Sequence, residues 1–182
     1  MTDTTPASAY DLSHEQATDE RRTLAVMVDN EPGVLARVVG LFAARGFNIE
    51  SLTVAEVDAS RHRSRITIVT NGTAQLLEQI EAQLMRLVPV GRVIDITRSP
   101  RGIERELALV KVAGTGDKRV EAMRLSEIFR ARVIDTTSES FVFELTGASD
   151  KLEQFIGLMK PLGLVEVSRT GVLSIQRGKE RG

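Results

Sequence analysis

The residues best suited to do chemistry lie in one turn, Asp29-Asn30-Glu31-Pro32-Gly33, which joins a β-rich segment to an amphipathic one. A helix that begins here presents free backbone N–H groups and the positive end of its dipole, and together these suit a carboxylate. Gly33 has no Cβ, so a ligand can approach the backbone closely. Asn30 adds a carboxamide that can donate or accept hydrogen bonds. The turn is therefore a candidate site for a small carboxylate.

A second carboxamide, Asn48, follows the amphipathic segment and begins the next β-rich one. Apolar side chains that could line a small pocket nearby are Val34, Leu35 and Ile49. Groups that bind a carboxylate, an amine and a modest apolar side chain together describe a receptor for a free amino acid. A purely structural interpretation stays open, in which Asn30 and Pro32 start a helix and Gly33 only turns the chain.

Other residue types predict no catalytic or metal centre. The two histidines, His14 and His62, have no partner at metal-ligand spacing, and no nucleophile motif is present. His62 lies in the basic run 61–65, which has no interleaved aromatic residue. Such a run favours a solvated hairpin tip or a partner-docking surface over a nucleic-acid site. We expect the chain not to be an enzyme by itself.

Composition bounds the class of protein. The 182 residues suit one medium domain or two small ones, and 42% hydrophobic residues exclude a fully disordered chain. A net charge of -1 gives no general basic excess for nucleic acid. The absence of cysteine excludes disulfides and thiolate metal sites and is compatible with the cytoplasm, the expected location. No apolar run is long enough to span a membrane, and we expect no signal peptide.

The pattern of the first half predicts strand, helix, strand, strand, helix, strand. These elements are expected at residues 23–29, from 34 to the Arg45-Gly46 stop, and at 48–57, 65–70, 73–88 and 90–97. The same order recurs in the second half, at 106–113, 117–130 with Asp117 as N-cap, 133–137, 141–146, 149–162, 164–168 and 172–175. The fold class is therefore α+β, with two ferredoxin-like βαββαβ sandwiches.

This pattern divides the chain into five parts. They are a disordered tail (1–22), a first domain (23–98), a linker (99–105), a second domain (106–177) and a charged tail (178–182). A sheet with helices on one face leaves its other face uncovered. Val26, Val54 and Val69 give neither face a clean polar pattern, so we expect a second subunit to cover that face or an edge strand. A monomer with scattered surface valines stays open.

Four segments carry a resemblance to a known family. The EPGVL turn (31–35), in its βαββαβ context, resembles an ACT domain, a small-molecule regulatory module. GLFAARGFNIESLTV (40–54), ELALVKV (106–112) and EIFRARVID (127–135) resemble the regulatory small subunits of acetolactate synthase, also called acetohydroxyacid synthase. The resemblance covers about residues 22–177.

The resemblance implies a non-catalytic subunit that binds and activates a large catalytic subunit. That partner condenses pyruvate with pyruvate or 2-oxobutyrate, using thiamine diphosphate, magnesium and FAD. The small subunit confers feedback inhibition by valine, sometimes by leucine or isoleucine. ACT domains of the family pair side by side as a homodimer, with valine at the interface. The implied contacts are Asn30, Gly33, Val34 and Leu35 of one protomer and Asn48 and Ile49 of its neighbour.

The second half carries a different turn at the equivalent place, residues 113–117, and is expected to lack the amino-acid site. One alternative function is a free-standing amino-acid sensor of the ACT type without an enzyme partner. A ferredoxin-like protein that binds RNA or a metal is another alternative. Missing strand aromatics and missing cysteines oppose this last alternative.

Overall fold

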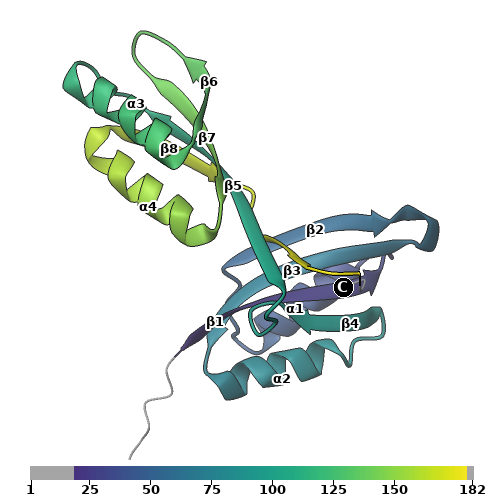
Figure 1. Ribbon diagram of the computed structural model, residues 1–182. Coiled ribbons are helices and arrows are strands. Elements are labelled where there is room, and N and C mark those ends of the chain that lie inside the picture. Colours follow the sequence, from purple (N-terminus) through teal and green to yellow (C-terminus); the bar gives the residue numbers. More distant parts are fainter. Residues whose placement is uncertain (1–18, 180–182) are drawn as a thin grey trace, which may run out of the picture.

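Strand β5 (Gly102–Val112) joins two separate α+β domains in the computed structural model of the chain (Figure 1). The structure describes residues 19–179, so His14 and most of the expected N-terminal tail lie outside the described residues. None of the helices in this range is long and apolar enough to cross a membrane.

The first domain has the βαββαβ order that the sequence predicts. Its elements are β1 (Glu20–Asp29), α1 (Val34–Ala44), β2 (Ser51–Asp58), the 3-10 turn η1 (Ala59–Arg61), β3 (Arg63–Gly72), α2 (Ala74–Leu84) and β4 (Val90–Asp95). The antiparallel sheet has the order β2-β3-β1-β4, which is ferredoxin-like. Strand β2 is therefore an edge strand.

Register and helical periodicity explain the core of this domain. In the pairing of β1 with β3, Leu24 lies opposite Ile68 and Val26 opposite Ile66, which places all four side chains on one face of the sheet. The apolar stripes of the two helices cover this face with Val34, Val38 and Phe42 from α1 and Leu77, Ile80 and Leu84 from α2. The Thr73 hydroxyl caps α2 by accepting from Leu76 N–H at 3.3 Å.

The second domain repeats the arrangement. Its elements are the C-terminal part of β5, α3 (Asp117–Phe129), β6 (Arg132–Thr136), β7 (Phe141–Gly147), α4 (Ser149–Met159), η2 (Lys160–Leu162) and β8 (Leu164–Arg169). The strand order β6-β7-β5-β8 is the same as in the first sheet. The prediction that Asp117 caps α3 is wrong. Gly116, with φ of 57°, is the N-cap, and Asp117 lies in the first turn, where the helix dipole favours a carboxylate.

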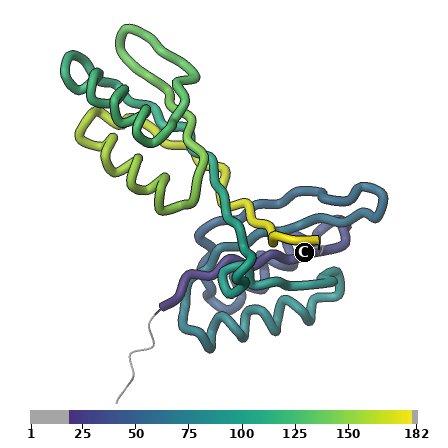
Figure 2. Tube along the Cα trace, in the orientation of Figure 1, coloured from purple at the N-terminus to yellow at the C-terminus, as the bar shows by residue number. Residues whose placement is uncertain are grey.

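The last strand, β9 (Leu173–Gln176), leaves the second domain and lies against the first (Figure 2). It pairs with the first four residues of β5, whereas the rest of β5 pairs with β7 and β8. Strand β5 therefore begins inside the segment 99–105 that the sequence suggested as a linker. The reason is that a ladder with β9, distant in sequence, extends β5 toward the first domain.

This two-stranded ribbon lies over the outer face of the first sheet, opposite the helices (Figure 1). Ala25, Ile94 and Ile96 form a separate buried cluster on the strands of that sheet, and Val69 is also fully buried. The chain itself therefore covers a portion of this face, and the expectation that a second subunit covers the face or an edge strand stays a prediction. Val54, on the edge strand, stays 46% exposed.

The first strand also begins earlier than expected. Residues assigned to the N-terminal tail, Glu20 to Arg22, form the start of β1. The Arg22 side chain is 1% exposed, with Nη2 2.9 Å from a Glu20 oxygen and Nη1 3.6 Å from an Asp95 oxygen. The carboxylates of Glu20 on the same strand and Asp95 on β4 compensate the cost of burying this charged side chain.

Candidate functional site

The start of α1 keeps the features that suit an anion. Gly33 is its N-cap, with φ of +84° in the left-handed region, and an ideal Cβ there would meet nothing within 4 Å. No side chain caps the helix. Within residues 19–179, the N–H groups of Leu35 and Ala36 have no hydrogen-bond acceptor. Free donors, open space and the positive end of the dipole therefore coincide at this turn.

Asn30 ties the turn to the hairpin formed by β2 and β3. Its backbone N–H donates to His62 O at 2.6 Å, and its Nδ2 donates to Glu56 Oε1 at 3.3 Å. Glu56 was not identified from the sequence, since it lies 26 residues further along the chain. Its carboxylate lies beside a turn whose N–H groups suit a carboxylate ligand. A free amino acid is a zwitterion, so a site for it needs donors for its carboxylate and an acceptor for its ammonium group.

The apolar candidates divide between the core and the surface. The side chain of Val34 is 7% exposed and belongs to the core of the first domain, so only its backbone could contact a ligand. Leu35 is 38% exposed. Ile49 is half-buried against the same core, while Asn48 is exposed and its carbonyl accepts from Thr70 Oγ1 at 2.6 Å.

One chain does not bring the two sets of candidates together. Asn30, Gly33 and Leu35 lie at the N-terminal end of α1, whereas Asn48 and Ile49 follow its C-terminal end. The helix has 11 residues and is about 16 Å long. Strand pairing gives the same separation. Both β1 and β2 run antiparallel to β3, so they run parallel to each other, and the first residue of β2 lies level with Thr23 near the start of β1. One end of the β2 edge of the sheet therefore lies near Gly33, and the other end lies near Asn48.

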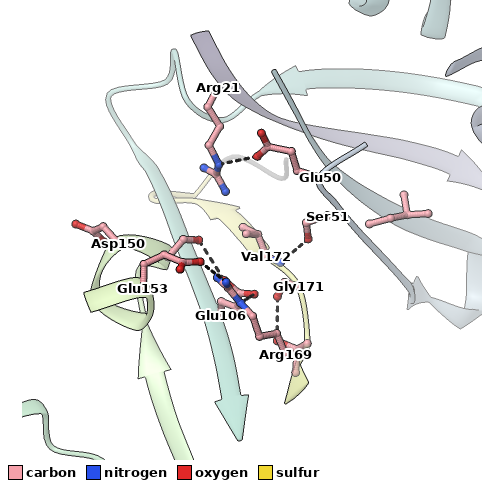
Figure 3. A pocket seen from close by; sticks show the side chains of 12 residues that line it. Arg21, Glu50, Ser51, Glu106, Asp150, Glu153, Arg169, Gly171 and Val172 are labelled. Carbon is pink, nitrogen blue, oxygen red and sulfur yellow. Dashed lines mark hydrogen bonds and ion pairs between the residues drawn. The ribbon is translucent and has the colours of Figure 1, made fainter. Parts of the chain in front are cut away.

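A larger cavity, about 740 Å³, lies between the two domains (Figure 3). Glu106 accepts from Arg169 Nε at 2.8 Å and from Nη2 at 2.6 Å, and Glu153 also pairs with Arg169. The hydrogen bonds to Glu106 and Glu153 raise the pKa of Arg169 above its ordinary value. Arg21 lies 3.3 Å from Glu50, so both guanidinium groups drawn at this cavity are paired.

Between the Arg21–Glu50 pair and the Arg169–Glu106 pair, Ser51 of β2 faces the backbone of the C-terminal segment (Figure 3), and Thr53 of the same strand also binds that backbone. Val172 N–H donates to Ser51 Oγ at 3.0 Å, and Thr53 Oγ1 donates to Val172 O at 3.0 Å. Gly171 adopts φ of +81°, and an added Cβ would lie 2.7 Å from Ser51 Oγ. We call these four residues the β2 clamp. Strand β2 begins at Ser51, three residues after Asn48 and not at Asn48 as predicted, so the clamp follows the segment that contains Asn48. Local sequence patterns gave no signal for the clamp.

The turn of the second domain differs in sequence but is also open at its N-cap. An added Cβ at Gly116 would meet nothing within 4 Å, as at Gly33, whereas one at Gly114 would lie 2.9 Å from Leu162 O. The segment after α4 therefore closes only the start of this turn, and the lack of an amino-acid site there stays a prediction. No group of three or more His, Asp or Glu that could hold a metal ion occurs in the part of the chain that the structure describes.

Comparison with known proteins places these features in a family. The profile described as small subunit of acetolactate synthase matches residues 105–178, and the profile described as AHAS small subunit-like ACT domain matches residues 24–92.

Individual relatives match over nearly their whole length. The acetolactate synthase small subunit of Haemophilus influenzae is 47% identical over 88% of this chain and 98% of its own length. The isozyme 3 small subunit of Escherichia coli is 46% identical over 87% of this chain and 96% of its own. The crystal structure of the small subunit from Thermotoga maritima superposes with a TM-score of 0.77 at 40% identity, covering 88% of this chain and 99% of that one.

Proposed function

The chain belongs to the family of acetolactate synthase small subunits, and from this premise we propose that it makes a large catalytic subunit sensitive to valine. As a regulatory, non-catalytic subunit it would activate that partner and confer feedback inhibition, with valine or another branched-chain amino acid as the signal. Thiamine diphosphate, magnesium and FAD would be bound by the catalytic partner.

One observation carries the proposal: the open, uncapped N-terminal end of α1 at Gly33. The N–H groups of Leu35 and Ala36 can receive the α-carboxylate, and an uncovered Cα lets it approach. The carboxylate of Glu56, held by Asn30, is placed to attract the ammonium group. The exposed side chain of Leu35 offers an apolar contact for the ligand.

Symmetry completes the site. In a two-fold dimer formed along the β2 edges, the start of one β2 lies near the end of the other. Asn48 and Ile49 of one protomer would then approach Gly33 of its neighbour, although one chain separates them by the length of α1. The exposed apolar residues Val54 (46%) and Val57 (52%) of β2 support this edge as the dimer interface.

The available interactions suit a feedback ligand. Metabolite concentrations of about 0.1–1 mM require a binding free energy of about -4 to -5.5 kcal/mol. Charge-assisted hydrogen bonds and one buried isopropyl group can supply this after entropy losses. A one-methylene difference changes binding by about 1–3 kcal/mol, so we expect imperfect discrimination among valine, leucine and isoleucine.

The direct experiment measures acetolactate production by the cognate catalytic subunit, with and without this chain, across a valine titration. Gly33→Asp places a negative charge where the ligand carboxylate binds, and we expect valine inhibition to be weakened about tenfold or more while activation persists. Gly33→Asn is the matched control, because asparagine tolerates the left-handed region and carries no charge. Equal valine responses in wild type and Gly33→Asp would show that the site is wrong.

Mixed dimers test whether the site spans two protomers. Gly33→Asp and Asn48→Ala each damage both sites of their own homodimer. In a dimer with one chain of each kind, one site carries both changes and the other carries neither. Refolding the two variants together should restore about a quarter of the valine sites, measured by calorimetry. A site contained in one chain would give no restoration. Valine binding without any effect on the catalytic subunit would favour an autonomous sensor.

A further inference from the structure

A second cavity, whose lining shares Val57 with the proposed dimer edge, lies on the outer face of the first sheet beneath the end of the C-terminal segment. Its volume is about 580 Å³. Its walls come from the β2–β3 hairpin, from β1 and from residues just before the C mark in Figure 1. The residues that line it are Met27, Val57, Asp58, Arg61, Arg63, Arg65, Ile175, Gln176, Gly178 and Lys179.

The lining carries four cationic side chains and one carboxylate. That carboxylate, Asp58, already accepts from Ser60 Oγ at 2.6 Å and lies 3.8 Å from Arg61 Nε. Arg63 is paired with Asp29, outside the lining, at 3.9 Å. Over residues 19–179, neither Arg65 nor Lys179 has a carboxylate within 4 Å. The cavity is therefore strongly positive.

Arg65 is the central group. In the register of the sheet it lies between Met27 on β1 and Ala55 on β2, on the face opposite the helical core. Its Nε and Nη2 atoms are buried and have no hydrogen-bond partner among residues 19–179. Burial lowers the pKa of Arg65, in keeping with a guanidinium that has lost water and gained no acceptor. Arg65 is half-buried as a residue, but these two nitrogens have lost water without gaining an acceptor, and buried donors in proteins normally have one.

We propose that this cavity binds the phosphate group of a small phosphorylated molecule. A phosphate monoester carries close to two negative charges at neutral pH and several acceptor oxygens. One guanidinium group can donate two parallel hydrogen bonds to two phosphate oxygens. Arg61, Arg63 and Lys179 also line the cavity with Arg65 and offer further donors. A single carboxylate would neutralise less of this charge.

The rest of the lining indicates an organic part next to the phosphate. Met27, Val57 and Ile175 form an apolar wall, and the volume of about 580 Å³ exceeds what one phosphate ion needs. Ile175 and Lys179 come from the C-terminal segment, whereas Arg65 belongs to β3. A ligand in this cavity would therefore bridge the first domain and the segment that leads back from the second.

Calorimetry on the full chain tests the proposal with phenyl phosphate, inorganic phosphate and acetate at constant ionic strength. Phenyl phosphate should bind, with acetate at least about tenfold weaker. Binding of phenyl phosphate more tightly than inorganic phosphate supports an organic phosphate as the ligand. Equal binding of both assigns the cavity to the free ion. Acetate binding as tightly as either phosphate would overturn the proposal in favour of a carboxylate partner.

Variants locate the binding. Arg65→Met keeps the aliphatic stem and should weaken phenyl phosphate binding about tenfold or more. Arg86→Met, an exposed position in the turn after α2, is the matched control and should change it less than about twofold. Lys179→Ala, at the exposed end of the segment, serves if Arg65→Met does not fold. No heat at about 10 mM phenyl phosphate, or unchanged binding in both cavity variants, would refute the site.

Discussion

Replacing Gly171 by alanine tests how the C-terminal segment is held against the first domain. Gly171 has φ of +81°, and an added Cβ would lie 2.7 Å from Ser51 Oγ and 3.0 Å from Thr53 Cγ2. Gly33 has a nearly identical φ of +84°, but nothing lies within 4 Å of an added Cβ there. Gly33→Ala is therefore a matched control that introduces the backbone strain without the collision.

Comparing the two glycine variants separates the stability cost of backbone strain from the stability cost of the collision. An L residue in the left-handed region costs about 1–2 kcal/mol at either position. Gly171→Ala also displaces Ser51 and Thr53, each of which makes one 3.0 Å hydrogen bond with Val172. Each bond contributes about 0.5–1.5 kcal/mol. The free energy of unfolding should thus fall by about 2–5 kcal/mol for Gly171→Ala and about 1–2 kcal/mol for Gly33→Ala.

Urea and thermal unfolding of the full chain, followed by circular dichroism, measure the difference. In a protein of this size each kcal/mol lowers the melting temperature by about 2–4 °C. Ser51→Ala removes the atom that collides, so its cost should be smaller in the Gly171→Ala background than in wild type by about 0.5–1.5 kcal/mol. If the two glycine variants lose the same stability, or if Ser51→Ala and Gly171→Ala add without coupling, the β2 clamp does not hold the segment.

Three further predictions concern the dimer edge and the two buried charges. Val54→Lys, on the exposed edge strand, should shift the protein from dimer to monomer in light scattering with unchanged circular dichroism, and a persistent dimer would contradict the β2 interface. Arg22→Met should lower the free energy of unfolding by about 1–3 kcal/mol, because the largely buried Asp95 loses its buried partner and keeps only the exposed Arg98, and unchanged urea unfolding would show that the pair contributes nothing. Glu106→Gln should destabilise the chain by about 1–3 kcal/mol, because Arg169 loses the buried one of its two charged acceptors and keeps only the exposed Glu153. A melting temperature equal to that of wild type would argue against that role.

The elements could be predicted because each rests on neighbours in sequence. The alternation that forms β1 and β3, and the helical spacing of Val38 and Phe42, are visible without any tertiary contact. The turn at Gly33 was recognised in the same way, because glycine and proline restrict or release the backbone locally. The N-cap of α3 was misplaced by one residue, because aspartate is favoured both at the cap and in the first turn of a helix.

Contacts between residues far apart in the chain could not be predicted from the sequence pattern. Arg22 was assigned to a tail because residues 1–22 are polar and show no periodicity, whereas its burial depends on Glu20 and on Asp95 of another strand. Glu56 and Asn30 meet only because the β2–β3 hairpin folds back beside the turn. Val34 was expected to line a ligand pocket, but the register of α1 turns its side chain into the core.

Two repeated βαββαβ units, a glycine turn before the first helix and the resemblance of both halves to one family were predictable from the sequence alone. These features depend on local periodicity and on short runs of neighbouring residues. Tertiary structure decided where β9 lies, which residues clamp it and where Arg65 is left without an anion. Strand pairing and packing join residues far apart in the chain, and no local pattern records which partner each of them meets.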